Sequence, residues 1–137
     1  KYYEPDLQLK FINSLLKLAN TSIDISDGLI DDLKKMINRQ SVSFHIFEKK
    51  IPVSNTLSQL IEIKKLRKID ITSRGDDYQI LFTANPIKSR IIKRISNNTG
   101  IKITKIGKII SGRNKSKIIN IKNKQIEAKN KGYIHQF

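Results

Sequence analysis

Two carboxylates that could bind a metal, Asp24 and Asp27, stand three residues apart on either side of the hydroxyl of Ser26. Alternating residues before them predict a strand, and apolar spacing after Gly28 predicts a helix. Carboxylates are natural ligands of Mg²⁺, which also keeps waters and contacts phosphates, and a helix N-terminus suits a phosphate. The segment therefore predicts a magnesium and phosphate site at a strand-to-helix turn. In the alternative interpretation, Ser26 or Asp27 only caps the helix, although Asp24, between two isoleucines, would still need a partner.

Two later segments carry further candidates for ligand binding. Asp76 and Asp77 lie in a polar turn before an apolar strand, and adjacent residues of an extended chain point to opposite sides, so at most one of them faces a given site. Tyr133 follows a glycine and can offer its ring to a flat ligand and its hydroxyl to a polar group. The alternatives are an acidic turn before a buried strand and an aromatic plug at the chain end.

The elements that must position these residues alternate between the helical and the extended pattern. The spacing predicts helices over 5–19, 29–37, 56–66 and 87–96, and strands over 22–25, 41–47, 78–82, 102–110, 117–121 and 125–127. In the second helix, Asp32 and Lys35 are expected on the outward face together with their charged neighbours. The chain is therefore predicted to be an α+β protein with a mixed β-sheet and helices packed on it.

Composition limits the classes of function that remain open. The 137 residues are 38% hydrophobic, which is enough for the core of one domain. The absence of cysteine excludes disulfides, thiolate metal sites and a cysteine nucleophile. The two histidines, His45 and His135, are 90 residues apart, which disfavours a histidine-rich zinc site. No long apolar run and no signal-peptide pattern occur, so we expect a cytoplasmic protein without a membrane partner, whose natural start precedes Lys1.

The positive charge is concentrated in the second half of the chain. Residues 1–77 carry 13 Lys and Arg against 11 Asp and Glu, whereas residues 78–137 carry 14 against Glu127 alone. Such a half attracts polyanions, including nucleic acid and phosphorylated ligands. Lys outnumbers Arg by 21 to 6, however, and the recognition of phosphate geometry favours Arg. The excess of lysine is therefore interpreted as a solvated surface, and nucleic acid is not the expected partner.

Taken in order, five segments resemble the C-terminal domain of the bacterial thiamine-monophosphate kinase family. They are Ala19–Leu33, Ile51–Ser54, Gly75–Thr83, Ile106–Ile109 and Gly132–His135. The resemblance implies a fold like the C-terminal domain of aminoimidazole ribonucleotide synthetase and its relatives. It also implies an activity, the Mg²⁺-dependent transfer of the ATP γ-phosphate to thiamine monophosphate, which gives thiamine diphosphate and ADP.

The family's pattern assigns a role to each candidate residue. The positions that match Asp24 and Asp27 bind magnesium, and the position that matches Ser26 contacts ATP. The positions that match Asp76 and Tyr133 contact the thiamine substrate, whose cationic rings suit an acid and an aromatic. No catalytic side chain is expected, because direct transfer between two phosphorylated ligands needs positioning and charge neutralisation rather than a covalent nucleophile.

The resemblance also implies that residues 1–137 form a single C-terminal domain of a two-domain kinase. The family's N-terminal domain carries most of the ATP site, usually forms the homodimer and is absent from this chain, so the chain alone is expected to be inactive. Three positions depart from the pattern: Arg74 stands where a second glycine is common, Asp76 where glutamate is common, and Gln136 is inserted before the final residue.

Two other functions remain as alternatives. One is another ATP-dependent enzyme of the same superfamily, such as a selenophosphate synthetase or a hydrogenase-maturation protein. The other is a small basic RNA-binding module, which would need exposed aromatic residues interleaved with Arg on one sheet face. Residues 101–131 contain no aromatic residue, which disfavours the RNA-binding alternative.

Overall fold

A computed structural model describes residues 9–73 and 79–127 of the chain. The helices are α1 (Leu9–Leu18), α2 (Leu29–Ile37), α3 (Asn55–Ile63), α4 (Lys68–Thr72) and α5 (Ser89–Thr99), with the 3₁₀ turns η1 (Glu48–Lys50) and η2 (Pro86–Lys88). The strands are β1 (Ala19–Asp24), β2 (Val42–Phe47), β3 (Ile80–Ala84), β4 (Gly107–Ser111), β5 (Lys117–Ile119) and β6 (Gln125–Ile126). In this part of the chain, no helix has the length and apolar character needed to cross a membrane.

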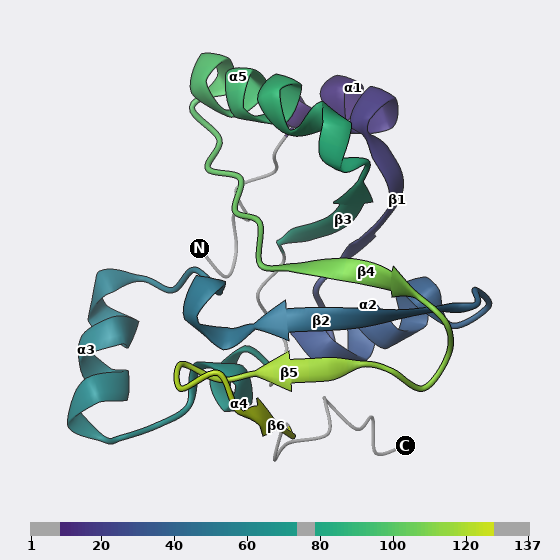
Figure 1. Ribbon diagram of the computed structural model, residues 1–137. Helices are drawn as coiled ribbons and strands as arrows, with labels where there is room; N and C mark the ends of the chain where they lie inside the picture. The colour runs from purple at the N-terminus through teal and green to yellow at the C-terminus, as the bar shows by residue number, and fades with distance from the viewer. Residues whose placement is uncertain (1–8, 74–78, 128–137) are drawn as a thin grey trace, which may run out of the picture.

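The strands form two sheets, shown in Figure 1. β1 pairs with β3 in an antiparallel ribbon that sets Asp24 opposite Ile80. The larger sheet has the order β4-β2-β5-β6, in which β2 runs antiparallel to β4 and parallel to β5. The predicted α+β class with a mixed sheet is confirmed. Residues 117–119 and 125–126 form the predicted hairpin.

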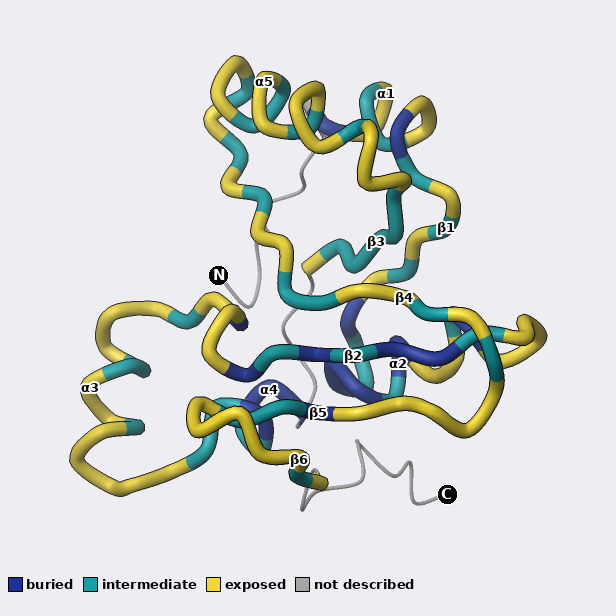
Figure 2. Tube along the Cα trace, in the orientation of Figure 1, coloured by how far each residue is buried: buried dark blue, intermediate teal, exposed yellow. Residues whose placement is uncertain are grey.

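The core lies between α2 and the larger sheet. Leu29, Leu33 and Ile37 recur at four-residue spacing along α2 and are all buried, as expected for the apolar stripe of an amphipathic helix. Phe44 and Ile46 of β2 belong to the same buried cluster. Figure 2 shows this burial concentrated along α2, β2 and α4, whereas α1 and α5 lie at the far end beside the ribbon of β1 and β3.

Several predicted elements have different bounds in the structure. The strands predicted over 22–25, 78–82 and 117–121 are Ala19–Asp24, Ile80–Ala84 and Lys117–Ile119. The helix predicted over 56–66 ends at Ile63, and a separate short helix, α4, follows it. The helix predicted over 87–96 begins with η2 and continues to Thr99, where Gly100 in the left-handed conformation ends it. The strand predicted over 102–110 was wrong in its first half, because only Gly107–Ser111 pairs with β2.

Candidate functional site

The candidate metal residues lie at the turn that joins β1 to α2, as the sequence predicts. Asp24 is the last residue of β1 and its side chain is exposed. The next amide, that of Ile25, donates to the carbonyl oxygen of Gln79 at 2.9 Å, so the turn leaves the β1–β3 ribbon at its end. Ser26 and Asp27 follow, both half-buried. The structure thus keeps both carboxylates and the hydroxyl on one short turn in front of a helix.

Gly28 closes this turn and brings it against a second segment of the chain. Its φ of 122° is open to glycine and costly for other residues. A β-carbon at this position would come within 2.6 Å of the carbonyl oxygen of Ser73. The backbone at Ser73 therefore lies directly on the turn, and Gln79 is hydrogen-bonded to Ile25 on its other side.

These two contacts place Ser73 and Gln79, the described residues on either side of the segment 74–78, beside the turn. Asp76, the predicted substrate residue, belongs to that segment and lies outside the described residues, as does Tyr133. The residues that flank this segment, Ser73 and Gln79, are 6 positions apart in the sequence. The buried hydroxyl of Ser73 has no hydrogen-bond partner among the described residues.

The turn is held by Asp32, a residue to which the sequence interpretation gave no role. Its side chain is 1% exposed, and the prediction that it faces outward was wrong. One oxygen, Oδ2, accepts hydrogen bonds from three successive backbone amides, those of Ser26, Asp27 and Gly28, at 3.0, 2.9 and 3.2 Å. The alternative in which Ser26 or Asp27 caps the helix was also wrong, because the N-cap is Gly28, without a side-chain cap bond.

Lys35 connects Asp32 to Asp27. It lies one helical turn after Asp32 and donates to Asp32 Oδ1 at 2.8 Å and to the carboxylate of Asp27. Burial by itself raises the pKa of Asp32, but the Lys35 ammonium and the turn amides outweigh it, so the pKa lies below the ordinary value of a carboxyl. Hydrogen bonds to the two carboxylates raise the pKa of Lys35. Both groups are therefore charged at neutral pH.

The donor set fits a magnesium ion that also contacts substrate. Within the part of the chain that the structure describes, no group of three or more His, Cys, Asp or Glu side chains could hold a metal by itself. Asp24 and Asp27 supply two carboxylates, and Mg²⁺ is commonly bound by one or two carboxylates together with waters and substrate phosphates. The turn can thus supply part of such a site and needs phosphate oxygens to complete it.

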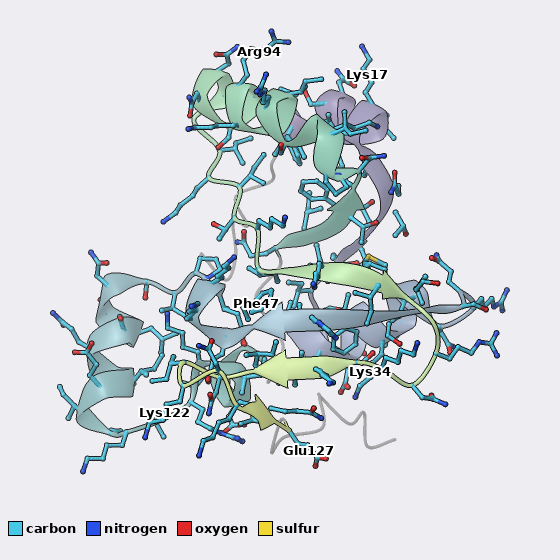
Figure 3. All side chains as sticks on the ribbon, in the orientation of Figure 1. Lys17, Lys34, Phe47, Arg94, Lys122 and Glu127 are labelled. Carbon is cyan, nitrogen blue, oxygen red and sulfur yellow. The ribbon has the colours of Figure 1, made fainter. Side chains whose placement is uncertain are left out.

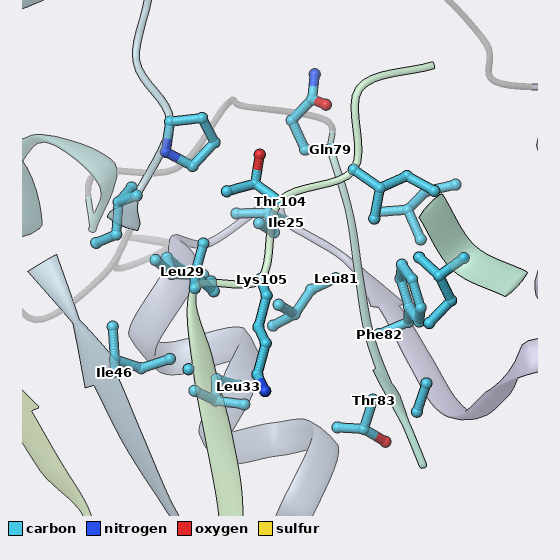
Figure 4. A pocket seen from close by; sticks show the side chains of 18 of the residues that line it. Ile25, Leu29, Leu33, Ile46, Gln79, Leu81, Phe82, Thr83, Thr104 and Lys105 are labelled. Atoms are coloured by element: carbon cyan, nitrogen blue, oxygen red, sulfur yellow. The ribbon is translucent and has the colours of Figure 1, made fainter. Parts of the chain in front are cut away.

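An apolar groove lies beside the turn but does not include its carboxylates. Figure 4 shows the side chain of Lys105 running between Leu29 and Leu33 on one side and Leu81 of β3 on the other. Asp24, Ser26 and Asp27 are not among the lining residues. The groove therefore does not include the candidate metal residues.

Among the described residues, the aromatic ring of Phe82 and the labelled basic side chains lie apart from one another. Phe82 is half-buried and packs against Phe11 with ring centroids 5.7 Å apart, so its ring is not free to stack on a base. Figure 3 shows Lys17 and Arg94 at the α1 and α5 end of the molecule and Lys122 near its opposite end. The interpretation of the lysines as a solvated surface stays a prediction.

Comparison with known proteins identifies similar sequences. No family model matches the chain. The thiamine-monophosphate kinase of Aquifex aeolicus is 34% identical over 84 residues, which is 61% of this chain and 28% of that protein. The thiamine-monophosphate kinase of Buchnera aphidicola subsp. Schizaphis graminum is 31% identical over 138 aligned positions, which is 98% of this chain and 41% of that protein. The chain thus spans between 28% and 41% of the length of these two relatives.

Solved structures agree with the sequence comparison. The crystal structure of thiamine-monophosphate kinase from Stenotrophomonas maltophilia K279a has a TM-score of 0.71 and 26% identity, and the match covers 83% of this chain and 35% of that one. A structure of AaThiL complexed with AMPPCP and TMP has a TM-score of 0.68 and 29% identity, over 96% of this chain and 38% of that one. The fold therefore defines the chain as a mixed α/β protein whose architecture matches one segment of these solved kinase structures. More particularly, it is similar in sequence and fold to one segment of the thiamine-monophosphate kinases, and the resemblance of its motifs is confirmed.

Proposed function

We propose that this chain is the C-terminal domain of a thiamine-monophosphate kinase. The parent protein transfers the γ-phosphate of ATP to the phosphate of thiamine monophosphate and releases thiamine diphosphate and ADP. The observation that carries the proposal is the 31% identity to a kinase of that name over 98% of this chain. The AaThiL structure, which contains AMPPCP and TMP together, supports the pairing of an ATP analogue with a phosphorylated acceptor.

In this proposal, Asp24 and Asp27 hold Mg²⁺ against the phosphates of ATP, and Ser26 contacts ATP through its hydroxyl. The bound Mg²⁺ supplies charge neutralisation for the transferred phosphoryl group. The chain's own contribution is to fix the two carboxylates on a turn that is already hydrogen-bonded. Because the amides of residues 26–28 donate to Asp32, a phosphate meets the metal and the Ser26 hydroxyl rather than these three amides.

The remaining parts of the site come from outside the described residues. We assign Asp76 and Tyr133 to the thiamine substrate, whose cationic rings are stabilised by a carboxylate and an aromatic face. The contacts of Ser73 and Gln79 with the turn support this assignment of Asp76, because they bring the described residues on either side of the segment 74–78 to the candidate site. We infer that an N-terminal domain supplies most of the ATP site and that the parent protein works as a homodimer in the cytoplasm.

The test uses the complete gene product that contains this sequence. ADP release is followed with Mg²⁺ and ATP, with and without thiamine monophosphate. We expect release that depends on thiamine monophosphate and on Mg²⁺. ADP release that does not depend on thiamine monophosphate would indicate another ATP-dependent enzyme of the superfamily. Absence of release from a folded protein would reject the proposal and point to Arg74, Asp76 or Gln136 as disabling changes.

A further inference from the structure

We propose that Asp32 is a positioning residue, whose buried carboxylate holds the turn 26–28 in the shape that presents Asp27 to a metal. This inference rests on the proposed function for the identity of the metal. Asp32 itself is not offered as a ligand, because its side chain is 1% exposed and both of its oxygens already accept hydrogen bonds.

The geometry joins turn and helix into one unit. The amide of Asp32 donates to the carbonyl oxygen of Gly28 at 3.0 Å, which is the first bond of α2, while its carboxylate reaches back to the amides of residues 26–28. Three donors that converge on one oxygen fix three successive peptide planes. Since Asp27 is the middle residue of the three, its side-chain direction is set by this carboxylate.

The negative charge of Asp32, as well as the shape of its carboxylate, stabilises the turn. Hydrogen bonds in which the acceptor is ionised are shorter and stronger than neutral ones. Lys35 donates to Oδ1, which leaves Oδ2 free to serve the three amides. The same ammonium donates to Asp27, so Lys35 bridges the carboxylates of Asp32 and Asp27. Removal of Asp32 would therefore release the backbone of the turn and leave Lys35 with Asp27 alone.

The first readout is hydrogen–deuterium exchange in the complete protein that contains this chain, which needs neither metal nor activity. Asp32→Ala removes the acceptor, and we expect exchange at the amides of residues 26–28 to rise by about tenfold or more. Asp32→Asn keeps one acceptor oxygen and loses the charge, so its increase should be smaller. Asp31→Asn is the matched control, because Asp31 neighbours Asp32 on α2 and pairs with Lys34 at the same i,i+3 spacing. Its exchange at 26–28 should stay unchanged.

The second readout is the affinity for Mn²⁺, measured by electron paramagnetic resonance as a probe for the Mg²⁺ site. We expect about tenfold weaker binding in Asp32→Ala, a smaller loss in Asp32→Asn, and no loss in Asp31→Asn. If the alanine variant does not fold, the asparagine variant decides on the same criteria.

Two results would overturn the proposal. One is unchanged exchange at residues 26–28 in the Asp32 variants. The other is faster exchange with undiminished Mn²⁺ affinity, which would leave Asp32 a purely structural role. Failure of the proposed function looks different: the unaltered protein would then bind no Mn²⁺ or show no ADP release dependent on thiamine monophosphate. In that case, hydrogen–deuterium exchange at the amides of residues 26–28 would still show whether Asp32 fixes the backbone of the turn.

Discussion

At the scale of single residues, Asp27 has the most direct predicted effect on activity. Asp27→Asn keeps the size of the side chain and removes the charge that would bind the metal. A loss of about 3 kcal/mol of transition-state stabilisation lowers a rate by about a hundredfold. The rate of ADP release by the complete protein should therefore fall by at least that factor. Glu62→Gln, the same chemical change on the exposed surface of α3, is the control and should leave the rate unchanged. Near-normal kinetics with an unchanged Mg²⁺ requirement would contradict the metal role of Asp27.

Gly28 gives a second prediction at this scale, on stability. In Gly28→Ala the new β-carbon would meet the Ser73 backbone at 2.6 Å, in addition to the cost of a positive φ. Forced overpacking of this kind costs about 1–3 kcal/mol, and a shift of this size should appear in urea unfolding. Gly100→Ala is the control, because its φ is also positive while nothing lies within 4 Å. Equal losses in the two variants would show that the contact with Ser73 has no energetic weight.

At the scale of elements, the helix α4 depends on a residue that is distant in sequence. Glu48 of η1 is buried, and its Oε1 accepts a hydrogen bond from the amide of Ile69 at 3.3 Å. Glu48→Ala leaves this amide without its acceptor in the core, which costs about 1–3 kcal/mol. Glu62→Ala on the exposed face of α3 should cost less than about 0.5 kcal/mol. Thermal or urea unfolding measures both, and equal stabilities would mean that Glu48 does not anchor α4.

The same contact explains which elements the sequence could reveal. The helix over 29–37 and the hairpin near the end were predicted because their periodicity and turn residues are local. The helix α4 was missed because five residues show too little periodicity, and its anchor, Glu48, is about 20 positions away. Asp32 was misplaced for a related reason. A charged residue beside Asp31 is expected outside, and only the folded turn creates the three amides that it accepts from.

At the scale of the molecule, the pairing of distant segments builds the candidate site. β1 and β3 are separated by 55 residues, yet their antiparallel pairing sets residue 79 beside the turn at residue 25. No local pattern predicts such a pairing, although the order of the motifs along the chain already matched the thiamine-monophosphate kinases. The sequence therefore predicted the strand-to-helix turn that carries the candidate residues, while its juxtaposition with residues 73 and 79 came from the structure. The metal-binding role of these residues stays a prediction.

The isolated chain, residues 1–137, is expected to be inactive as a kinase. Its described residues hold no cluster of three or more metal-binding side chains, and the chain spans at most 41% of the two relatives compared above. Transfer of a phosphoryl group requires the attacking oxygen, the phosphorus and the leaving oxygen to be held in line, which two carboxylates on one turn do not achieve. We therefore expect no thiamine-monophosphate-dependent ADP release from residues 1–137 at concentrations at which the complete protein turns over. Circular dichroism shows whether the isolated chain is folded, and robust turnover by it would contradict the need for a second domain.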